Sequence, residues 1–393
     1  MSKTIKIAIY TGVVPSSTFI ERLIHGLAKK GLQVYLFGVQ RKKPDSYNNV
    51  FHFTIIKKRI NRLLQLIKYS LLLRFFCYKD KKKLDIFISA QNKNARQLKI
   101  KYYPVLYHRP NIFHLQWAKS IEDWLWVQEF GIKLVLSLRG THVTISPIGD
   151  QQWKEVYSEH FPRIDGFHAV SVSMIPIAQE FGVNPEKIKV VRSGLEIEKL
   201  PFTEKPEVGK ELSIVSIGRS HWVKGYSYAL DAMNLLEKDN IDFNYTIVGV
   251  EKDEELLYKR SQFKLEDKIT FKSTLPFTEV LDIIRNADVL LLSSVEEGIA
   301  NVVLESMALG TLVVSTDCGG MSEVITDNKN GFLVPSRNSE AMAKALKNVS
   351  EINIETYKDL TRAARNTIEA KHNCENMIVE MKDLYHTVLN NQL

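Results

Sequence analysis

The chain has 393 residues, of which 45% are apolar and 25% charged, so it is long enough for two or three domains with full cores. Its three cysteines have no paired spacing, which argues against a disulfide framework or a zinc site and fits a reducing compartment. The net charge of +8 is local, because residues 57–83 hold ten basic side chains and one acidic one, while the remainder holds 43 and 44.

The start of the chain bears on location. Residues 1–4 lead directly into an apolar run, which predicts no secretory signal peptide. No apolar run approaches the roughly 20 residues that cross a bilayer. We therefore expect a cytoplasmic protein.

The first half of the chain alternates short apolar runs with helical patterns. A helix is expected over 19–30, with Gly31 as its C-cap, and residues 11–17 before it are expected to form a loop. Strands are expected at 5–10, 34–37, 112–115, 133–138, 166–170 and 188–191. Helical stretches fall between the later strands, at 120–130 and 172–181.

The basic segment 57–83 also has an apolar periodicity. Its apolar residues recur at helical spacing: Ile60, Leu63, Leu64, Ile67, Leu71, Phe75 and Tyr78. A basic amphipathic helix of this kind binds anionic membrane surfaces, which predicts a peripheral position on the inner face of the cell membrane. The alternative is a helix that covers the sheet, with its charges in solvent.

A polar stretch with two prolines, 201–210, reads as a linker, after which the alternation restarts. Strands are expected at 212–217, 245–248, 269–272, 289–292, 312–315 and 332–334. Helices are expected at 223–236, 278–286, 302–309 and 339–349, and residues 355–389 are helical with no strand after them.

This alternation predicts an α/β protein with two Rossmann-like, doubly wound parallel sheets that face each other across a cleft. The expected domains are 1–200, a linker at 201–210, a second domain at 211–370 and a C-terminal helix at 371–393 that could pack on either domain. A periplasmic binding protein has a similar layout, but the missing signal peptide argues against it.

Glu297 and Glu305 bracket the junction between an expected strand and a helix that begins near Asn301. In open parallel sheets, ligands bind at the carboxyl ends of the strands, where the first amides of a helix can hold an anion. A carboxylate on each side of an anion site suits a ligand with hydroxyls at both ends of a phosphate group. The alternative is that Glu305 is a solvated helix residue and Asn301 an N-cap.

The second half opens with a strand that ends at Gly218 and is followed by two cations, Arg219 and Lys224. An arginine can fork two phosphate oxygens and a lysine adds a point charge, so the pair could neutralise a diphosphate without a metal. Both could equally be ordinary surface cations. We expect His221 between them to cap or pack rather than to catalyse.

These motifs together resemble a known family, the retaining GT-B glycosyltransferases of family four. The matching stretches are Gly218-Arg219 with Lys224-Gly225, Glu297-Gly298, Glu305-Ser306-Met307-Ala308, Gly319-Gly320-Met321-Ser322-Glu323 and Asn330-Gly331-Phe332-Leu333-Val334. Their order and spacing match the family over about residues 212–350. The resemblance implies a GT-B fold and a hexosyltransferase that uses a nucleotide-diphosphate sugar and no metal.

The resemblance also implies roles for single residues. Arg219 and Lys224 would grip the donor diphosphate, Glu305 would hold the ribose hydroxyls and Glu297 would face the transferred sugar. The leaving diphosphate would assist the departure of the acceptor proton, with retention of configuration. The donor-binding set also includes Gly218, Gly298, Ala300, Asn301 and Val302, where Ala300 replaces the family's usual second glycine and Ile299 its phenylalanine.

The first domain resembles the family more weakly. Residues 15–20 resemble a stretch found in a polysaccharide-building subgroup, where the loop with Gly12 would approach the donor; an ordinary helix N-cap at Ser17 is the alternative. Arg139 and His142 stand where the family often has histidine and aspartate. Either could contact the sugar or an acceptor phosphate.

The resemblance implies a donor linked to UDP or GDP and a glycan or lipid-linked glycan as acceptor, in the synthesis of a cell-surface polysaccharide such as lipopolysaccharide. An epimerase of nucleotide-sugars on the same scaffold is one alternative. A nucleic-acid-binding protein is another, prompted by the isoelectric point near 9.1. The local charge and the lack of an aromatic platform argue against nucleic acid.

Overall fold

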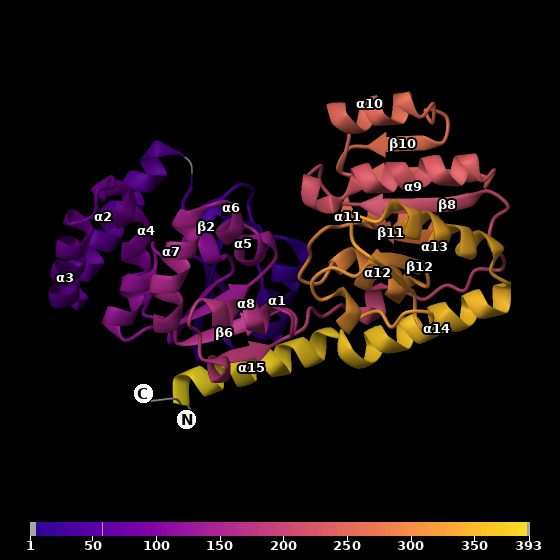
Figure 1. Cartoon of the computed structure of the whole chain (residues 1–393). Helices are drawn as coiled ribbons and strands as arrows, with labels where there is room; N and C mark the ends of the chain where they lie inside the picture. The colour runs from indigo at the N-terminus through magenta and orange to yellow at the C-terminus, as the bar shows by residue number, and fades with distance from the viewer. Residues whose placement is uncertain (1–4, 57, 391–393) are drawn as a thin grey trace. The chain divides into compact units, whose positions relative to one another are not determined.

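The computed structural model describes residues 5–56 and 58–390, which form two compact units (Figure 1). The first unit contains the chain up to residue 169, residues 175–191 and the chain from 377 onward. The second contains residues 170–174 and 192–376. Each unit is described by itself, and a cleft between two domains stays a prediction.

The first unit is built on a seven-stranded sheet in the order β3-β2-β1-β4-β5-β6-β7, with every neighbouring pair parallel. The strands are β1 (Lys6–Val14), β2 (Gln33–Gln40), β3 (Val50–His52), β4 (Ile112–Leu115), β5 (Lys133–Leu138), β6 (Gly166–Ala169) and β7 (Ile188–Val190). The helices are α1 (Thr18–Lys29), α2 (Arg59–Phe76), α3 (Tyr78–Ser89), α4 (Ala95–His108), α5 (Thr141–Thr144), α6 (Ser146–Gly149), α7 (Gln151–His160), α8 (Met174–Glu180) and α15 (Cys374–Asn390), of which residues 377–390 belong here.

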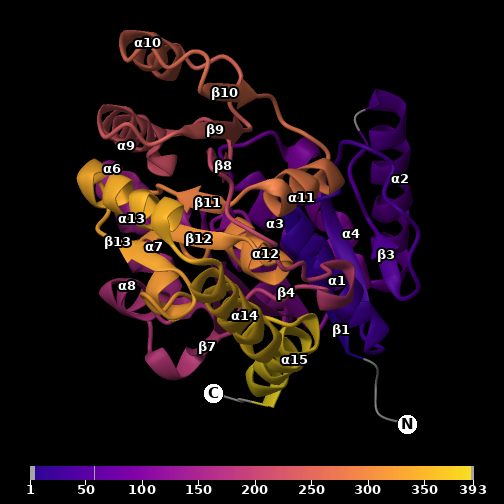
Figure 2. The same ribbon diagram turned by 90° about the vertical axis from the view of Figure 1, so that its right-hand side faces the viewer.

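The second unit has a six-stranded parallel sheet in the order β10-β9-β8-β11-β12-β13, whose strands follow one another in Figure 2. They are β8 (Leu212–Ile217), β9 (Phe243–Val248), β10 (Ile269–Lys272), β11 (Val289–Leu292), β12 (Leu312–Thr316) and β13 (Phe332–Val334). The helices are α9 (Tyr226–Lys238), α10 (Glu254–Gln262), α11 (Phe277–Asn286), α12 (Asn301–Leu309), α13 (Ser339–Glu351) and α14 (Ile354–Lys371).

Helices cover both faces of the second sheet. One core contains the buried sides of α9 and α13, and a separate core contains those of α11, α12 and α14. The central strands β11 and β12 contribute side chains to both cores and read as continuous apolar runs, whereas β9 and β10 contribute buried side chains to the first core only. The predicted doubly wound α/β class is confirmed for both units.

All twelve expected strands are present, but the expected loop at 11–17 is wrong. Strand β1 continues to Val14, with a bulge between Tyr10 and Gly12 where the pairing with β2 shifts. The hydroxyl of Thr11 donates to the carbonyl of Val13 at 2.7 Å, so the polar residue is satisfied inside the strand. Gly12 therefore lies at a strand bulge, with φ at +76°.

The helical expectations for two segments also need correction. Residues 120–130 contain only short 3-10 turns, Ala118–Ser120 and Leu125–Phe130. The stretch 355–389 is two helices, α14 and α15, separated at His372 and Asn373. The break occurs because the carbonyl of His372 accepts from the amide of Leu195 at 2.7 Å.

The basic segment forms two helices rather than one. Helices α2 and α3 meet at Cys77, and both contact α4, which the sequence did not predict (Figure 1). Lys57, the first cation of the segment, lies outside the described residues. None of the helices in the described ranges is both long enough and apolar enough to cross a membrane.

Candidate functional site

The predicted cation and carboxylate of the second unit meet at the carboxyl ends of two strands. Lys224 ends the short 3-10 helix Trp222–Lys224 after β8, and Glu297 lies in the loop after β11. The Nζ atom of Lys224 is 2.5 Å from Oε1 of Glu297, and the hydroxyl of Ser294 donates to the same oxygen at 3.1 Å. The structure thus brings together two residues that are 73 positions apart in sequence.

Gly218 makes room for this lysine. A Cβ atom at Gly218 would lie 2.8 Å from the hydroxyl of Tyr226 and 3.1 Å from Cε of Lys224. That hydroxyl also donates to the carbonyl of Gly218 at 3.0 Å. A larger residue would displace the lysine, which explains the glycine at the end of β8 in terms of packing.

The two loops are fastened to each other by backbone bonds. The amide of Val295 donates to the carbonyl of Val223 at 2.7 Å, and the hydroxyl of Ser293 donates to the carbonyl of Lys224 at 2.8 Å. Between them lies Gly225, with φ at +64°, where a Cβ atom would come within 2.0 Å of the Ser293 carbonyl. Only glycine permits this approach.

The Gly-Gly turn after β12 supports the loop that carries Glu297. Gly319 has φ at +56°, and a Cβ atom there would lie 1.6 Å from the carbonyl oxygen of Glu297. The amide of Gly320 donates to the carbonyl of Gly298 at 2.9 Å. The motif therefore acts through the backbone, because it holds residues 297 and 298 in place.

Helix α12 begins at Asn301, so Ala300 rather than Asn301 is its N-cap residue. Ala300 has no side chain that can cap, and the Val303 amide donates to its carbonyl at 3.0 Å. Within the described residues, no hydrogen bond from the amides of Asn301 and Val302 is found. Such amides at a helix start suit an anion.

Glu305 lies on the second turn of α12 and is 5% exposed. This excludes the alternative in which it is a solvated helix residue.

Arg219 follows β8 directly, but its side chain is exposed. Within the described residues it makes no ion pair, and the structure does not bring it against Lys224 or Glu297. His221 accepts from the amide of Val223 at 3.3 Å through Nδ1, so it caps the 3-10 helix as expected. Of the two predicted cations, only Lys224 is held at the site.

Burial shifts the pKa of two ionisable residues that neighbour Lys224 and Glu297. Burial, with the charge of Glu297, raises the pKa of Glu296. Burial also raises the pKa of the Cys318 thiol to about 12, so this cysteine stays protonated. Lys224 and Glu297 form the ion pair at the centre of the site.

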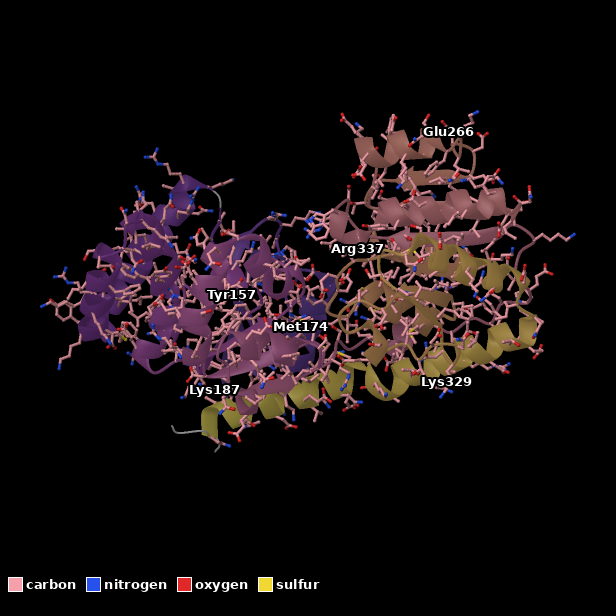
Figure 3. All side chains as sticks on the ribbon, viewed as in Figure 1. Tyr157, Met174, Lys187, Glu266, Lys329 and Arg337 are labelled. Atoms are coloured by element: carbon pink, nitrogen blue, oxygen red, sulfur yellow. The ribbon has the colours of Figure 1, made fainter. Side chains whose placement is uncertain are left out.

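The corresponding edge of the first unit carries Arg139 and His142. Arg139 follows β5, and its guanidinium lies 4.8 Å from the ring centre of Phe19. The ring centre of Trp117 lies 6.5 Å from the ring centre of Phe19 and 5.3 Å from that of His142. Tyr157, labelled in Figure 3, donates from its hydroxyl to the His142 carbonyl and so holds helix α5.

A chain of buried hydrogen bonds crosses the same face of this sheet. Nε2 of His168 lies 2.9 Å from the Val191 carbonyl, so it must donate, and Nδ1 must accept from the hydroxyl of Ser137. Ser137 then accepts from Nε2 of His114, whose Nδ1 accepts from the hydroxyl of Tyr385. Burial lowers the pKa of His114 to about 3, so the chain is neutral.

Gln116 is a polar residue that the sequence reading missed. It is fully buried, and neither atom of its amide has a hydrogen-bond partner within the described residues. The available signal was its place directly after the apolar strand β4.

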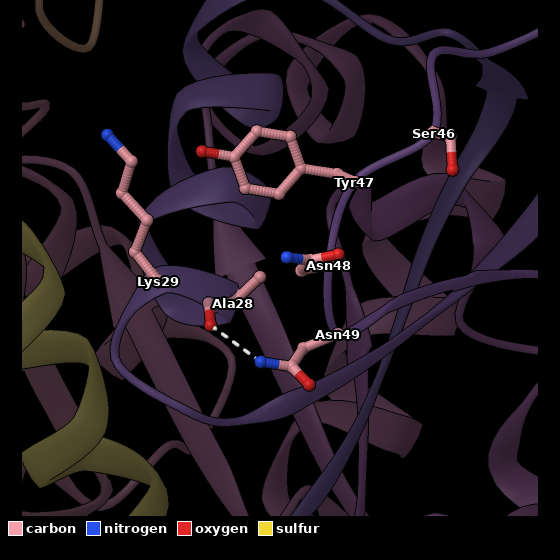
Figure 4. A pocket seen from close by; sticks show the side chains of 6 residues that line it. All are labelled: Ala28, Lys29, Ser46, Tyr47, Asn48 and Asn49. Carbon is pink, nitrogen blue, oxygen red and sulfur yellow. Dashed lines mark hydrogen bonds between the residues drawn. The ribbon is translucent and has the colours of Figure 1, made fainter.

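Two surface hollows among the described residues are lined by neither Lys224 nor Glu297. One of about 470 Å³, shown in Figure 4, is lined by Ala28, Lys29, Ser46, Tyr47, Asn48 and Asn49. The last four precede β3, so they lie at the amino edge of the first sheet, opposite the strand ends described above. Another, of about 440 Å³, lies beside residues 220–228 in the second unit, but neither Lys224 nor Glu297 lines it.

Residues 199–367 match the family model described as glycosyl transferases group 1. The chain is 30% identical over 265 residues to the putative colanic acid biosynthesis glycosyltransferase WcaL of Salmonella typhimurium. It is 28% identical over 250 residues to the amylovoran biosynthesis glycosyltransferase AmsK of Erwinia amylovora. These matches cover 64% and 60% of this chain, and 65% and 61% of the relatives, which is less than two thirds of their length.

Solved structures agree at the level of fold. Anabaena HepE in complex with UDP-glucose has a TM-score of 0.75 at 14% identity, over 98% of this chain and all of that one. A glycosyltransferase from Rickettsia africae has a TM-score of 0.72 at 17% identity, over 99% of this chain and all of that one. These neighbours confirm the GT-B class of fold, and the names of the relatives do not favour an epimerase or a nucleic-acid-binding protein.

Two further motifs of the group 1 region are structural. Glu323 accepts from the amides of Val172 and Ser173, both at 3.0 Å. Asn330 is buried and bonds through its side chain to Thr326, Val324 and Thr367. The roles assigned to Glu297, Glu305, Lys224 and the other site residues stay predictions.

Proposed function

We propose that this chain is a retaining glycosyltransferase that moves a sugar from a UDP- or GDP-linked donor to a glycan or lipid-linked glycan, in cell-surface polysaccharide synthesis. The observation that carries the proposal is the pair of Lys224 and Glu297 at the strand ends, beside helix α12 and the buried Glu305. These groups lie inside residues 199–367, the region that matches the group 1 family model.

In this proposal Lys224 binds the donor diphosphate together with Arg219, and the first amides of α12 add hydrogen-bond donors. Lys224 then exchanges part of its contact with Glu297 for phosphate oxygens. Glu297 is left with free lone pairs that can accept from hydroxyls of the transferred sugar. The positive charge comes from side chains, and no metal takes part.

In this proposal, electrostatic stabilisation of the leaving diphosphate lowers the barrier, and no side chain acts as a general base. As the bond between the sugar and the diphosphate lengthens, negative charge grows on the leaving oxygen, and Lys224 stabilises it more strongly than in the ground state. The same oxygen takes the proton of the acceptor hydroxyl on the same face of the sugar, which retains the configuration. Arg139 and His142 contact the sugar or the acceptor.

Calorimetric titration of the full chain with UDP and GDP tests the donor site. One of them is expected to bind, and Lys224→Ala should weaken its binding about tenfold, the loss of one charge-assisted contact. Nucleotide release that depends on an added acceptor then tests transfer. Failure of both nucleotides to bind, or near-normal transfer by both Lys224→Ala and Glu297→Ala, would reject the function.

Contact with an anionic membrane is the second part of the proposal. One stripe of α2 is apolar yet between 47% and 78% exposed: Ile60, Leu64, Ile67, Leu71 and Phe75. Phe76 and Tyr78, where α2 meets α3, are also exposed, at 73% and 61%. Exposed cations flank these residues: Arg59, Lys68, Arg74, Lys79, Lys82 and Lys83.

The opposite side of α2 carries the buried Tyr69 and Leu73 and packs on α4, so the exposed stripe is not needed for the core. An apolar stripe between cations suits a bilayer with anionic headgroups, and such a surface would bring a lipid-linked acceptor to the enzyme.

Flotation with vesicles that contain anionic lipid tests this contact. The full chain is expected to float at moderate salt, and Leu71→Ser with Phe75→Ser should abolish flotation. The control is Ile148→Ser on α6, which removes an even more exposed apolar side chain that is not part of the stripe. Equal flotation of the double variant and the control would reject the membrane surface.

A further inference from the structure

The carboxyl edge of the first sheet holds a cation without a counter-charge. Arg139 is half-buried, and no carboxylate of the described residues forms an ion pair with it. Its only polar contact is a long one, 3.5 Å from Nη2 to Nδ1 of His168, and Nε is buried without a partner. Burial lowers the pKa of Arg139 to about 10, still far above neutral pH.

The groups around Arg139 cannot supply the missing charge. His168 and His114 are neutral, because burial lowers the pKa of both. Phe19 presents an aromatic face to the guanidinium. A charge that is partly removed from water without a counter-charge destabilises the folded state, and an anionic ligand would supply that counter-charge.

Gln116 is the second, independent observation. His114 and Ser137 are bonded on one face of the sheet, and Gln116 and Arg139 each follow one of them by two positions. Gln116 and Arg139 each lie one residue beyond the end of their strand, and continuing the strand alternation places both on that same face, at the carboxyl edge. There the Gln116 amide has both a donor and an acceptor unpartnered, although it is fully buried.

We propose that Arg139 and Gln116 form an oxyanion-binding subsite, which takes a carboxylate or phosphate carried by one of the two substrates. The guanidinium offers parallel N–H donors that match the two oxygens of such a group, and the Gln116 amide adds a donor. The substrate is then an acidic sugar or a sugar phosphate rather than a neutral sugar. This inference rests on the proposed sugar transfer for what the subsite serves, but not for the presence of the subsite.

The effect of a Gln116 substitution on thermal stability distinguishes a binding role for this residue from a structural one. A buried polar group without a partner destabilises the folded state, and an apolar side chain of similar shape removes that cost. Gln116→Leu is therefore expected to raise the midpoint of thermal unfolding by about 2–4 °C and to weaken oxyanion binding. A purely structural glutamine would show the opposite, a lower midpoint and unchanged binding.

Calorimetry on the full chain with two pairs of probes tests the subsite. One pair is UDP-glucuronate and UDP-glucose; the other is glucose 1-phosphate and glucose, each added with saturating UDP. In one pair or the other, the anionic probe should bind about tenfold more tightly than the neutral one, the value of one charge-assisted contact. A preference in the first pair assigns the oxyanion to the donor, and in the second to the acceptor.

Variants assign the preference to its residues. Arg139→Gln should abolish it and Arg139→Lys should keep only part of it, because lysine retains the charge but not the fork. The control is Arg163→Gln, which removes an exposed arginine of the same unit and should change nothing. If Arg139→Gln fails to fold, Gln116→Leu carries the test alone.

Two results would overturn the subsite: no anionic preference in either probe pair, or a preference that survives in both Arg139→Gln and Gln116→Leu. These are separable from failure of the proposed function. A chain that binds UDP or GDP but shows no anionic preference loses only the subsite. A chain that prefers glucose 1-phosphate but binds neither nucleotide keeps the subsite and loses the proposed function.

Discussion

The strand ends of the two units present cations in opposite ways. In the second unit, Lys224 has a carboxylate partner, Glu297, at 2.5 Å, so the site is balanced without a ligand. In the first unit, Arg139 has no such partner among the described residues and lies beside neutral histidines. A paired site can exchange one anion for another, whereas an uncompensated one gains stability only when an anion arrives.

The difference also shows how each edge is held. The second unit uses glycines and backbone bonds, at Gly218, Gly225 and Gly319, to bring two loops together. The first unit uses a series of side-chain hydrogen bonds that runs from Tyr385 to His168. Substitutions in the second unit should therefore disturb the packing of its loops, whereas substitutions in the first unit should break its hydrogen-bond network.

The largest effect is expected from breaking the charged pair. Lys224→Ala should lower the rate of sugar transfer by about 10²–10³-fold, because one preorganised group for the leaving charge is lost. The measurement is acceptor-dependent nucleotide release. Lys347→Ala is the control: it removes a lysine that pairs with Asp239 at 2.9 Å on the surface of the same unit, and the rate should stay within twofold, since exposed pairs contribute little.

Gly319→Ala tests the backbone support of the same site. The added Cβ atom would overlap the Glu297 carbonyl, so the loop must move, and we expect a loss of about 3 kcal/mol in the free energy of unfolding. Transfer should fall as Glu297 is displaced. In Gly131→Ala the backbone has a similar positive φ but open space, so that control should lose only about 1 kcal/mol. Equal losses would show that the close approach is unimportant.

The sequence predicted the second unit more completely than the first. Its site residues sit in motifs with fixed spacing, and glycines between apolar strands and helices mark where the loops turn. The helix start near Asn301 was predicted correctly, but the exposure of Arg219 was not, because no local pattern shows which of two neighbouring cations the loops hold.

In the first unit the expected strands are correct, but the polar network within them was invisible. His114, Ser137 and His168 lie inside apolar runs, and only strand register brings them together. The missing hydrogen-bond partner of the Gln116 side chain depends on tertiary packing, so no local sequence pattern could predict it. The missed strand β3 has three residues, too few for a periodicity to identify it.

The histidines predict that the first unit is the more acid-sensitive. Burial lowers the pKa of four of its histidines: His52, His108, His114 and His168. The unfolded chain binds a proton at each near pH 6.5, before the folded chain does, so stability is constant above that pH and falls as the pH drops below it. A histidine whose folded pKa lies well below this range, such as His108 or His114, contributes a slope of up to about 1.4 kcal/mol per pH unit.

Urea unfolding between pH 7.5 and 5, followed by tryptophan fluorescence, measures this slope, and four of the five tryptophans lie in the first unit: Trp117, Trp124, Trp126 and Trp153. Carboxylates of the unfolded chain titrate mostly below this range. His114→Gln should reduce the slope by the share of one proton. A stability that does not change between pH 7.5 and 5 would contradict the neutral network.

The smallest effect is expected where the network begins, at Tyr385. Its hydroxyl donates to Nδ1 of His114 at 2.8 Å, and the direction of every later bond is set by the Val191 carbonyl, which can only accept. The chain cannot reverse when the hydroxyl is removed, so Tyr385→Phe leaves one buried acceptor without a donor. We expect a loss of about 1–2 kcal/mol in the free energy of unfolding, read by the same fluorescence. Tyr78→Phe, on an exposed tyrosine of α3, should lose nothing, and an equal effect of the two variants would show that the network does not stabilise the first unit.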